Sequence, residues 1–146
     1  MALPVTVLRR NSGTNLVGRK TSSSKTYGRA EQVAVQASAA LDSSVAPIVA
    51  PSGFTGSTLV VGAAVVAAEG KMVLLSGKVG LNKFGVATPW AIVETDTSGK
   101  AHGDKIYMDN TTAGVLSYAN TSGVQVGYVL GDAATKGYLY LEPGRY

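Results

Sequence analysis

The nine residues GTNLVGRKT, from Gly13 to Thr21, come close to a loop that binds nucleotide phosphates. Such a loop needs a lysine and then a hydroxyl side chain directly after its second glycine, because these groups and the backbone N–H groups surround the phosphates. Here Arg19 separates Gly18 from Lys20. A phosphate-binding loop must lead into a helix, but the serine- and threonine-rich residues that follow here are poor helix formers. The sequence therefore argues against nucleotide binding.

Other residues with catalytic or metal-binding potential are also weak candidates. Ser22-x-x-Lys25 has the form of a serine acylase motif, but it lies in a run of serines without a helical pattern. His102 is the only histidine and the chain has no cysteine, which excludes a thiol nucleophile and a histidine pair. Asp104 and Asp109 flank a predicted strand, and we expect both to shape turns rather than to hold a metal. We therefore expect no enzymatic activity, no cofactor and no metal site.

Charge divides the chain into two parts. Residues 1–30 contain six of the 13 Lys and Arg residues and no Asp or Glu, whereas residues 31–146 contain the other seven against nine acids. The first part therefore carries a charge of +6 and the second −2. The six cations are candidates for contact with a partner protein: Arg9, Arg10, Arg19, Lys20, Lys25 and Arg29.

Residues 1–30 also contain few large apolar side chains, so they cannot bury enough surface to offset the entropy of ordering. We expect an extended arm that becomes ordered on a partner. A solvated tail and a nucleic-acid-binding arm are the alternatives, although Tyr27 is the only aromatic residue interleaved with the six cations. The apolar run 59–68 is too short to span a bilayer, and the N-terminus lacks the order of a signal peptide. We therefore expect a soluble protein made inside the cell.

The remainder of the chain predicts an all-β fold, a small antiparallel barrel or sandwich. Glycine and β-branched residues are frequent, and turn signals recur about every 8–12 residues between short apolar runs. We interpret residues 42–58 as a connecting loop because of their prolines, and Ser76-Gly77 as the turn of a hairpin. Ranges 31–41 and 89–93 fit either a helix or a strand. The expected strands are 59–61, 64–68, 72–75, 78–81, 84–88, 105–108, 114–118, 124–130 and 138–142.

These patterns divide the chain into an arm (1–30), a linker with an ambiguous strand and loop (31–57) and a β domain (58–146). In the last expected strand, Tyr138 and Tyr140 share one face and two leucines share the other, which is typical of a strand with one face in the core. Four aromatic residues are candidates for an interface: Tyr27, Trp90, Tyr138 and Tyr140. For the tryptophan we expect packing in the core or at its rim, with an interface anchor as the alternative.

Several short motifs lie in the second half of the chain. They are AEGKMVLLSGKVG (Ala68–Gly80), GDKIYMD (Gly103–Asp109), SGVQVGYVL (Ser122–Leu130) and YLYL (Tyr138–Leu141). Their order and their turn residues resemble those of tailed-phage capsid cement proteins, also called head decoration proteins. The resemblance covers about residues 58–142.

This resemblance implies a small β domain, commonly trimeric, on the outer face of an icosahedral shell that it strengthens. The partner would be the major capsid protein. The protein would be made in the host cytoplasm and located on the capsid surface of the virion. It would bind no membrane, and nucleic acid would be the less favoured partner. Met108 and Tyr128 depart from the family pattern, and the arm and the loop 45–54 lie outside it.

Overall fold

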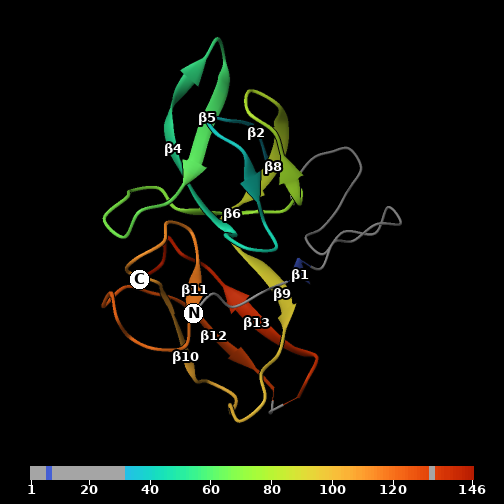
Figure 1. Cartoon of the computed structure of the whole chain (residues 1–146), viewed down its shortest axis with the longest axis vertical. Helices are drawn as coiled ribbons and strands as arrows, with labels where there is room; N and C mark the ends of the chain where they lie inside the picture. The colour runs from blue at the N-terminus through green and yellow to red at the C-terminus, as the bar shows by residue number, and fades with distance from the viewer. Residues whose placement is uncertain (1–5, 8–31, 132–133) are drawn as a thin grey trace.

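The computed structural model of the chain describes residues 6–7, 32–131 and 134–146. Within these ranges every regular element is a β-strand (Figure 1). The all-β fold class predicted from the sequence is therefore confirmed. Of the predicted N-terminal arm the structure describes Thr6 and Val7, which form strand β1, and the rest of that prediction lies outside the described residues.

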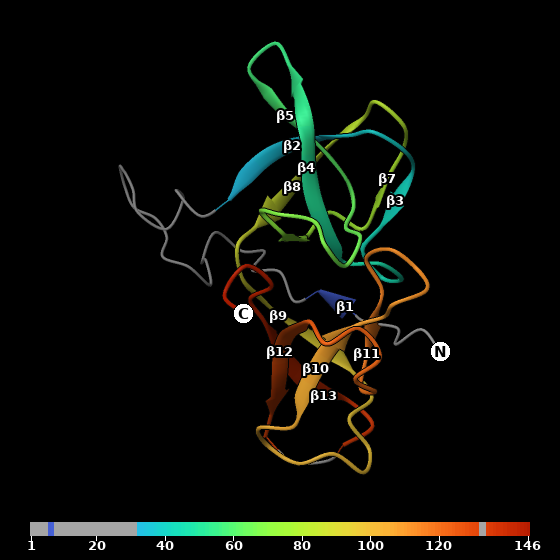
Figure 2. The same cartoon turned by 90° about the vertical axis from the view of Figure 1, so that its left-hand side faces the viewer.

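Five strands close into a small barrel, which is the upper lobe in Figure 1. Four of the five pairings are antiparallel, whereas β2 and β5 run parallel. A two-stranded sheet of β3 (Leu41–Asp42) and β7 (Lys78–Val79) belongs to the same lobe (Figure 2). The order around the barrel is β2 (Val33–Ala37), β5 (Thr58–Ala63), β4 (Ile48–Thr55), β6 (Met72–Leu74) and β8 (Phe84–Thr88).

The second lobe is an open antiparallel sheet of six strands, below the barrel in Figures 1 and 2. Pro89 and Trp90 link the last barrel strand, β8, to the first long strand of this sheet, β9. The strand order is β1 (Thr6–Val7), β9 (Ala91–Thr95), β13 (Gly137–Leu141), β12 (Gln125–Leu130), β10 (Lys105–Met108) and β11 (Leu116–Ser117).

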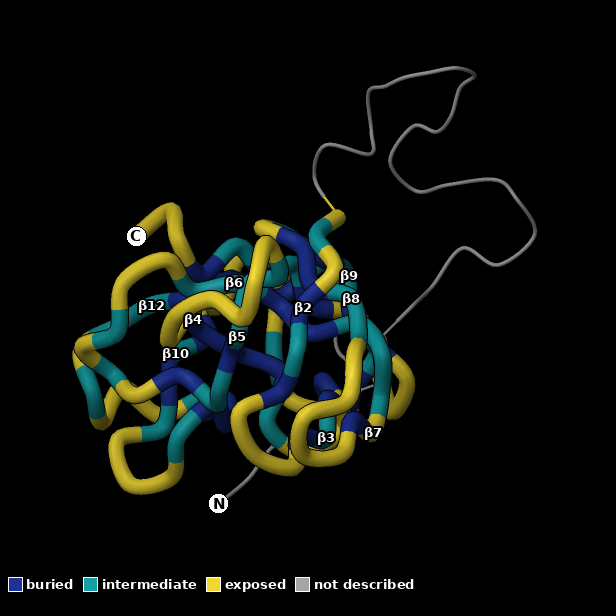
Figure 3. Tube along the Cα trace, turned by 90° about the horizontal axis from the view of Figure 1, so that it is seen from above, coloured by how far each residue is buried: buried dark blue, intermediate teal, exposed yellow. Residues whose placement is uncertain are grey.

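Strands β4 and β6 form a wall that both lobes share. Along β4, Ile48 packs into the core that includes the six-stranded sheet, whereas the next residue, Val49, packs into the core of the barrel. Val73 and Leu74 of β6 divide between the two cores in the same way. Successive side chains of a strand point to opposite faces, so a strand between two cores must be apolar at every position. The two lobes are therefore joined through buried residues, and the exposed residues lie around them on loops and on outer strand segments such as 51–55 of β4 (Figure 3).

A triangle of backbone hydrogen bonds also joins the lobes. The N–H of Ile48 donates to the carbonyl of Gly114 at 3.1 Å, the N–H of Gly114 donates to the carbonyl of Ala64 at 2.8 Å, and the N–H of Ala64 donates to the carbonyl of Ile48 at 3.0 Å. Gly114 adopts a positive φ of 77°, a conformation that favours glycine. The loop between β10 and β11 is thereby fixed to the start of β4.

The interpretation of residues 42–58 as a connecting loop is wrong for 48–55, which form β4. Its prolines are tolerated for local reasons. Pro47 precedes the strand and accepts the Leu74 N–H with its carbonyl, and Pro51 lies where the pairing with β5 shifts register. A proline is compatible with a strand at a bulge because the ladder is interrupted there. The range 32–57 contributes β2, β3 and β4, so the ambiguous segment forms strand β2 at 33–37 rather than a helix.

Two further expectations are wrong. Residues 64–68 do not form a strand, because the pairing of β5 with β4 ends at Ala63 and the chain then turns, with the Ala68 N–H bonded to the Val65 carbonyl. Ser76-Gly77 does not close a hairpin, because β6 pairs with β4 and β8 whereas β7 pairs with β3. The ambiguous range 89–93 is a bend that leads into strand β9 at Ala91.

Candidate functional site on the outer face of the six-stranded sheet

Alternation along the six-stranded sheet places tyrosines on the face that points away from the core. In β13, Leu139 and Leu141 are buried, whereas Tyr138 is 42% exposed and Tyr140 is partly exposed. This arrangement confirms the predicted division of that strand into a tyrosine face and a leucine face. The register extends the outer face across the sheet, because Tyr128 of β12 lies opposite Tyr140, and Lys105 of β10 lies opposite Tyr128.

Four rings form a continuous contact series across this face, which we call the aromatic row: Trp90, Tyr140, Tyr128 and His102. Trp90 stacks on Tyr140 with ring centroids 5.9 Å apart and an interplanar angle of 26°. Tyr140 and Tyr128 lie 5.4 Å apart at 35°, and His102 meets Tyr128 edge-on at 6.3 Å. Aromatic pairs at such separations stabilise each other beyond the area they bury. The rings therefore fix one another's orientation.

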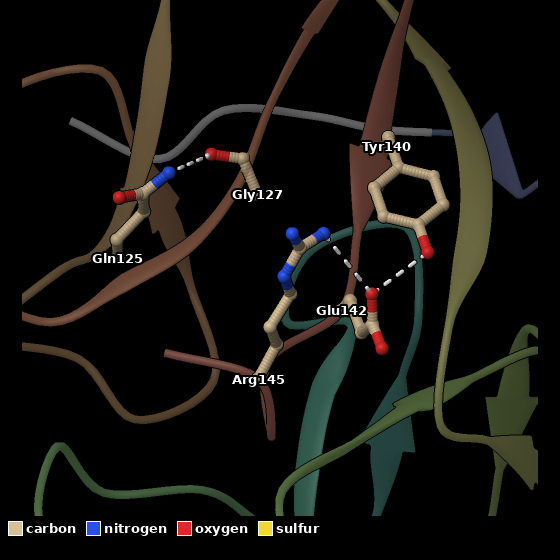
Figure 4. A network of polar contacts seen from close by, with 5 residues as sticks. All are labelled: Gln125, Gly127, Tyr140, Glu142 and Arg145. Atoms are coloured by element: carbon tan, nitrogen blue, oxygen red, sulfur yellow. Dashed lines mark hydrogen bonds and ion pairs between the residues drawn. The ribbon is translucent and has the colours of Figure 1, made fainter.

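A hydrogen bond holds the hydroxyl group of Tyr140, one of the four rings of the aromatic row (Figure 4). The Tyr140 hydroxyl donates to Oε1 of Glu142 at 2.8 Å, and the Arg145 guanidinium lies 3.8 Å from the same oxygen. Nearby on β12, the Gln125 side-chain amide donates to the Gly127 carbonyl at 3.1 Å. Burial, and then the hydrogen bond to Glu142, raise the pKa of Tyr140 to about 12. Tyr140 is therefore protonated, and a hydrogen-bond donor, at neutral pH.

An open pocket of about 280 Å³ lies at the β10–β11 end of the sheet, and we call it the lysine–tyrosine pocket. The Lys100 ammonium lies 4.6 Å from the centroid of the Tyr118 ring, within the range of a cation–π contact. The Tyr118 hydroxyl donates to the Asp96 carbonyl at 2.9 Å. The pocket is lined by Lys100, Asp104, Lys105, Tyr107 and Tyr118. Because Lys105 pairs with Tyr128, the pocket adjoins the aromatic row.

The structure brings together part of the predicted site. Trp90, Tyr138 and Tyr140 lie on or beside one face, and Trp90 and Tyr140 are in contact. The predicted partner contacts Arg9, Arg10, Arg19, Lys20, Lys25 and Arg29, with Tyr27, lie outside the described residues. Whether the three aromatics serve an interface stays a prediction.

The expectation that Asp104 and Asp109 shape turns is confirmed. Oδ2 of Asp109 accepts hydrogen bonds from the Thr111 hydroxyl and from the N–H groups of Thr111 and Thr112, and the Thr111 hydroxyl bond is the main cause that lowers its pKa. Oδ2 of Asp104 accepts the Ala101 N–H at 2.8 Å. In the described part of the chain, no three His, Asp or Glu side chains are grouped as a metal would require.

Five residues of the outer face were missed from the sequence: Lys100, Lys105, Tyr107, Tyr118 and Tyr128. Tyr107 and Tyr128 each alternate with buried residues in a strand whose range was expected, so their outward direction could have been predicted. What brings them together is the register of β10, β12 and β13, and no residue pattern in the sequence specifies it.

The two tyrosines with raised pKa values predict a loss of stability at alkaline pH. Burial is the main cause that raises the pKa of Tyr118 to about 12, as for Tyr140, against an ordinary value of 10.0. The folded state therefore holds these protons more tightly than the unfolded state, and the free energy of unfolding should fall as pH rises from 10.0 to about 12. Denaturant titrations at several pH values should show a shallower fall for the double variant Tyr118→Phe/Tyr140→Phe. Parallel curves would contradict the assignment.

Comparison of this chain with family models, with curated proteins and with solved structures finds no match. Its fold is all-β on the evidence of its own strands. Among the described residues, no helix is long and apolar enough to cross a bilayer.

Proposed function

We propose that this chain is a structural virion protein, a capsid decoration or cement subunit. It binds the outside of an icosahedral shell, and residues 1–30 bridge neighbouring major capsid subunits. The observation that carries the proposal is the partition of charge: a +6 segment without a single acid is joined to a folded part of charge −2. A cationic segment attached to a separate folded part suits attachment to an acidic surface.

Strand β1 shows that the N-terminal segment can pair with a sheet through its main chain. Thr6 lies opposite Glu94 and Val7 opposite Val93, so β1 adds to an edge of the sheet through its main chain. Strand addition gives affinity without a deep pocket, and many copies on one shell add their contacts. A segment that can extend a sheet in this way is suited to lying along a neighbouring subunit.

Exposed apolar side chains on the barrel lobe offer further contacts. Phe54, near the tip of the β4–β5 hairpin, is 70% exposed, and Phe84 on β8 is 66% exposed. An exposed aromatic side chain is a frequent anchor of protein interfaces because it buries a large area at a low entropy cost. We assign these residues to contact with the shell or with a second copy in the proposed trimer.

The test is to image shells of the virus that carries this chain, prepared with and without it. We expect density for the chain on the outer shell surface at local symmetry axes, and a higher temperature of shell disassembly when it is present. Density on the inner surface, or shells of unchanged thermal stability with no added density, would overturn the proposal.

Nucleic-acid binding by the same six cations is the second candidate. It predicts that purified protein shifts DNA in a gel. The affinity should fall steeply as salt is raised, because basic side chains that bind phosphates release counterions from the DNA. Tight, salt-dependent binding together with density on the genome side of the shell would favour this candidate.

A further inference from the structure

We propose that the outer face of the six-stranded sheet binds a saccharide, with sugar rings on the aromatic row and one acidic sugar unit in the lysine–tyrosine pocket. The site lies on different residues from the cationic segment and the barrel phenylalanines, so it adds an activity to the proposed attachment. It does not depend on that attachment.

The aromatic row provides partly exposed ring surface for sugar rings. A sugar ring presents C–H groups on its faces, and these are attracted to the negatively charged face of an aromatic ring. Tyr128 and Tyr140 are partly exposed on adjacent strands, and their ring centroids lie 5.4 Å apart. Because contacts with neighbouring rings and the bond to Glu142 already orient them, little side-chain entropy is lost on binding.

The lysine–tyrosine pocket provides the polar groups that recognise an acidic sugar. Lys100 and Lys105 carry ammonium donors, and within the described part of the chain neither forms an ion pair with an acid. Asp104 accepts the Ala101 N–H with one oxygen and keeps further acceptor capacity for a hydroxyl group. The pocket volume of about 280 Å³ lies near the lower end of the range for small-molecule sites, roughly 300–1,000 Å³, which suits a single sugar unit.

Charge favours a saccharide over a single-stranded nucleic acid. Channels for single strands combine aromatic platforms with a strongly positive groove. On this face the two lysines are offset by Asp104 and by Glu94, which lies opposite Tyr138, and residues 31–146 carry a net charge of −2. A polyanion would be repelled, whereas a saccharide with one carboxylate needs only the local positive charge of the two lysines.

The emission of Trp90, the single tryptophan, provides a direct measurement because Trp90 stacks on Tyr140 in the row. The full-length protein is titrated with 3′-sialyllactose, a trisaccharide with one carboxylate, with neutral maltotriose and with oligothymidylate. We expect a saturable change in emission with 3′-sialyllactose and an affinity at least about tenfold weaker for maltotriose, because the neutral sugar cannot pair with the lysines.

Two variants locate the site. Lys105→Gln removes an exposed charge and should lower the affinity for 3′-sialyllactose about tenfold without altering the fold. Phe84→Ala, on the barrel, is the matched control and should bind as the unmodified protein does.

Four results would overturn the proposal. They are the absence of saturation with 3′-sialyllactose, an unchanged affinity in Lys105→Gln, tighter binding of oligothymidylate than of 3′-sialyllactose, and self-association of the chain that Lys105→Gln abolishes.

Discussion

Replacement of Gly114 by alanine is expected to lower the free energy of unfolding by about 3 kcal/mol or more. Two costs add at this position. A φ of 77° is strained for any residue with a Cβ atom, and the new methyl group would lie 2.7 Å from the Ile48 carbonyl oxygen and 3.1 Å from Cβ of Ala46. The carbonyl cannot move aside easily, because it accepts the Ala64 N–H in the triangle that joins the lobes.

Gly123 provides a matched control for this substitution. Its φ is also 77°, but nothing lies within 4 Å of a Cβ atom built on it. Gly123→Ala therefore measures the conformational strain alone, about 1 kcal/mol, and the difference between the two variants measures the steric cost at the junction. Denaturant unfolding of both variants gives the two values. Equal losses of stability would show that the loop between β10 and β11 can move away from β4, and that the triangle does not hold the lobes together.

Strands β8 and β10 occupy the ranges expected, 84–88 and 105–108. For β10 the alternation of outward and buried residues and the flanking turn residues are local signals. β4 was missed because its first residues are buried on both faces, so they show no alternation, and because its prolines suggested a loop. The shared wall between the lobes is a property of the tertiary structure, and the local pattern does not encode it.

The candidate site could be predicted only in part, for a related reason. The outward direction of Tyr138 and Tyr140 follows from the period of two along one strand. Their contact with the rest of the face depends on which strands are neighbours, and β12 is the strand that places Tyr128 beside Tyr140. Lys100 and Tyr118 reach the pocket from the ends of loops, whose paths are set by turns such as the one at Asp96, where Oδ1 accepts the Ser98 N–H.

The pairing of β1 with β9 refines the proposed role of the N-terminal segment. An arm that orders only on a partner would leave its own sheet edge uncovered, yet Thr6 and Val7 pair within their own chain. This pairing covers two residues of a five-residue strand, so it contributes few hydrogen bonds. The charges that we assign to shell contact begin at Arg9, beyond that pairing. Strand pairing and charge are therefore separable by mutation.

Deletion of residues 2–30 is expected to leave a folded protein that binds shells at least about tenfold more weakly. The protein should fold because, within the described residues, the buried side chains of the two hydrophobic cores lie between Val35 and Leu141. A second variant keeps β1 and replaces the six cations by glutamine: Arg9, Arg10, Arg19, Lys20, Lys25 and Arg29. Co-sedimentation with shells measures attachment, and circular dichroism with thermal unfolding measures the fold.

Comparison of the two variants separates the sources of affinity. If charge dominates, the glutamine variant should bind as weakly as the deletion, and attachment of the unmodified protein should weaken as salt is raised, because salt screens exposed charges. If the main chain of the segment contributes through strand addition, the deletion should bind more weakly than the glutamine variant. If the truncated protein coated shells as well as the full chain does, residues 1–30 would not have the role in attachment that we propose. A truncated protein that fails to fold would instead move the boundary of the folded part toward the N-terminus, with β1 as the element that the sheet requires.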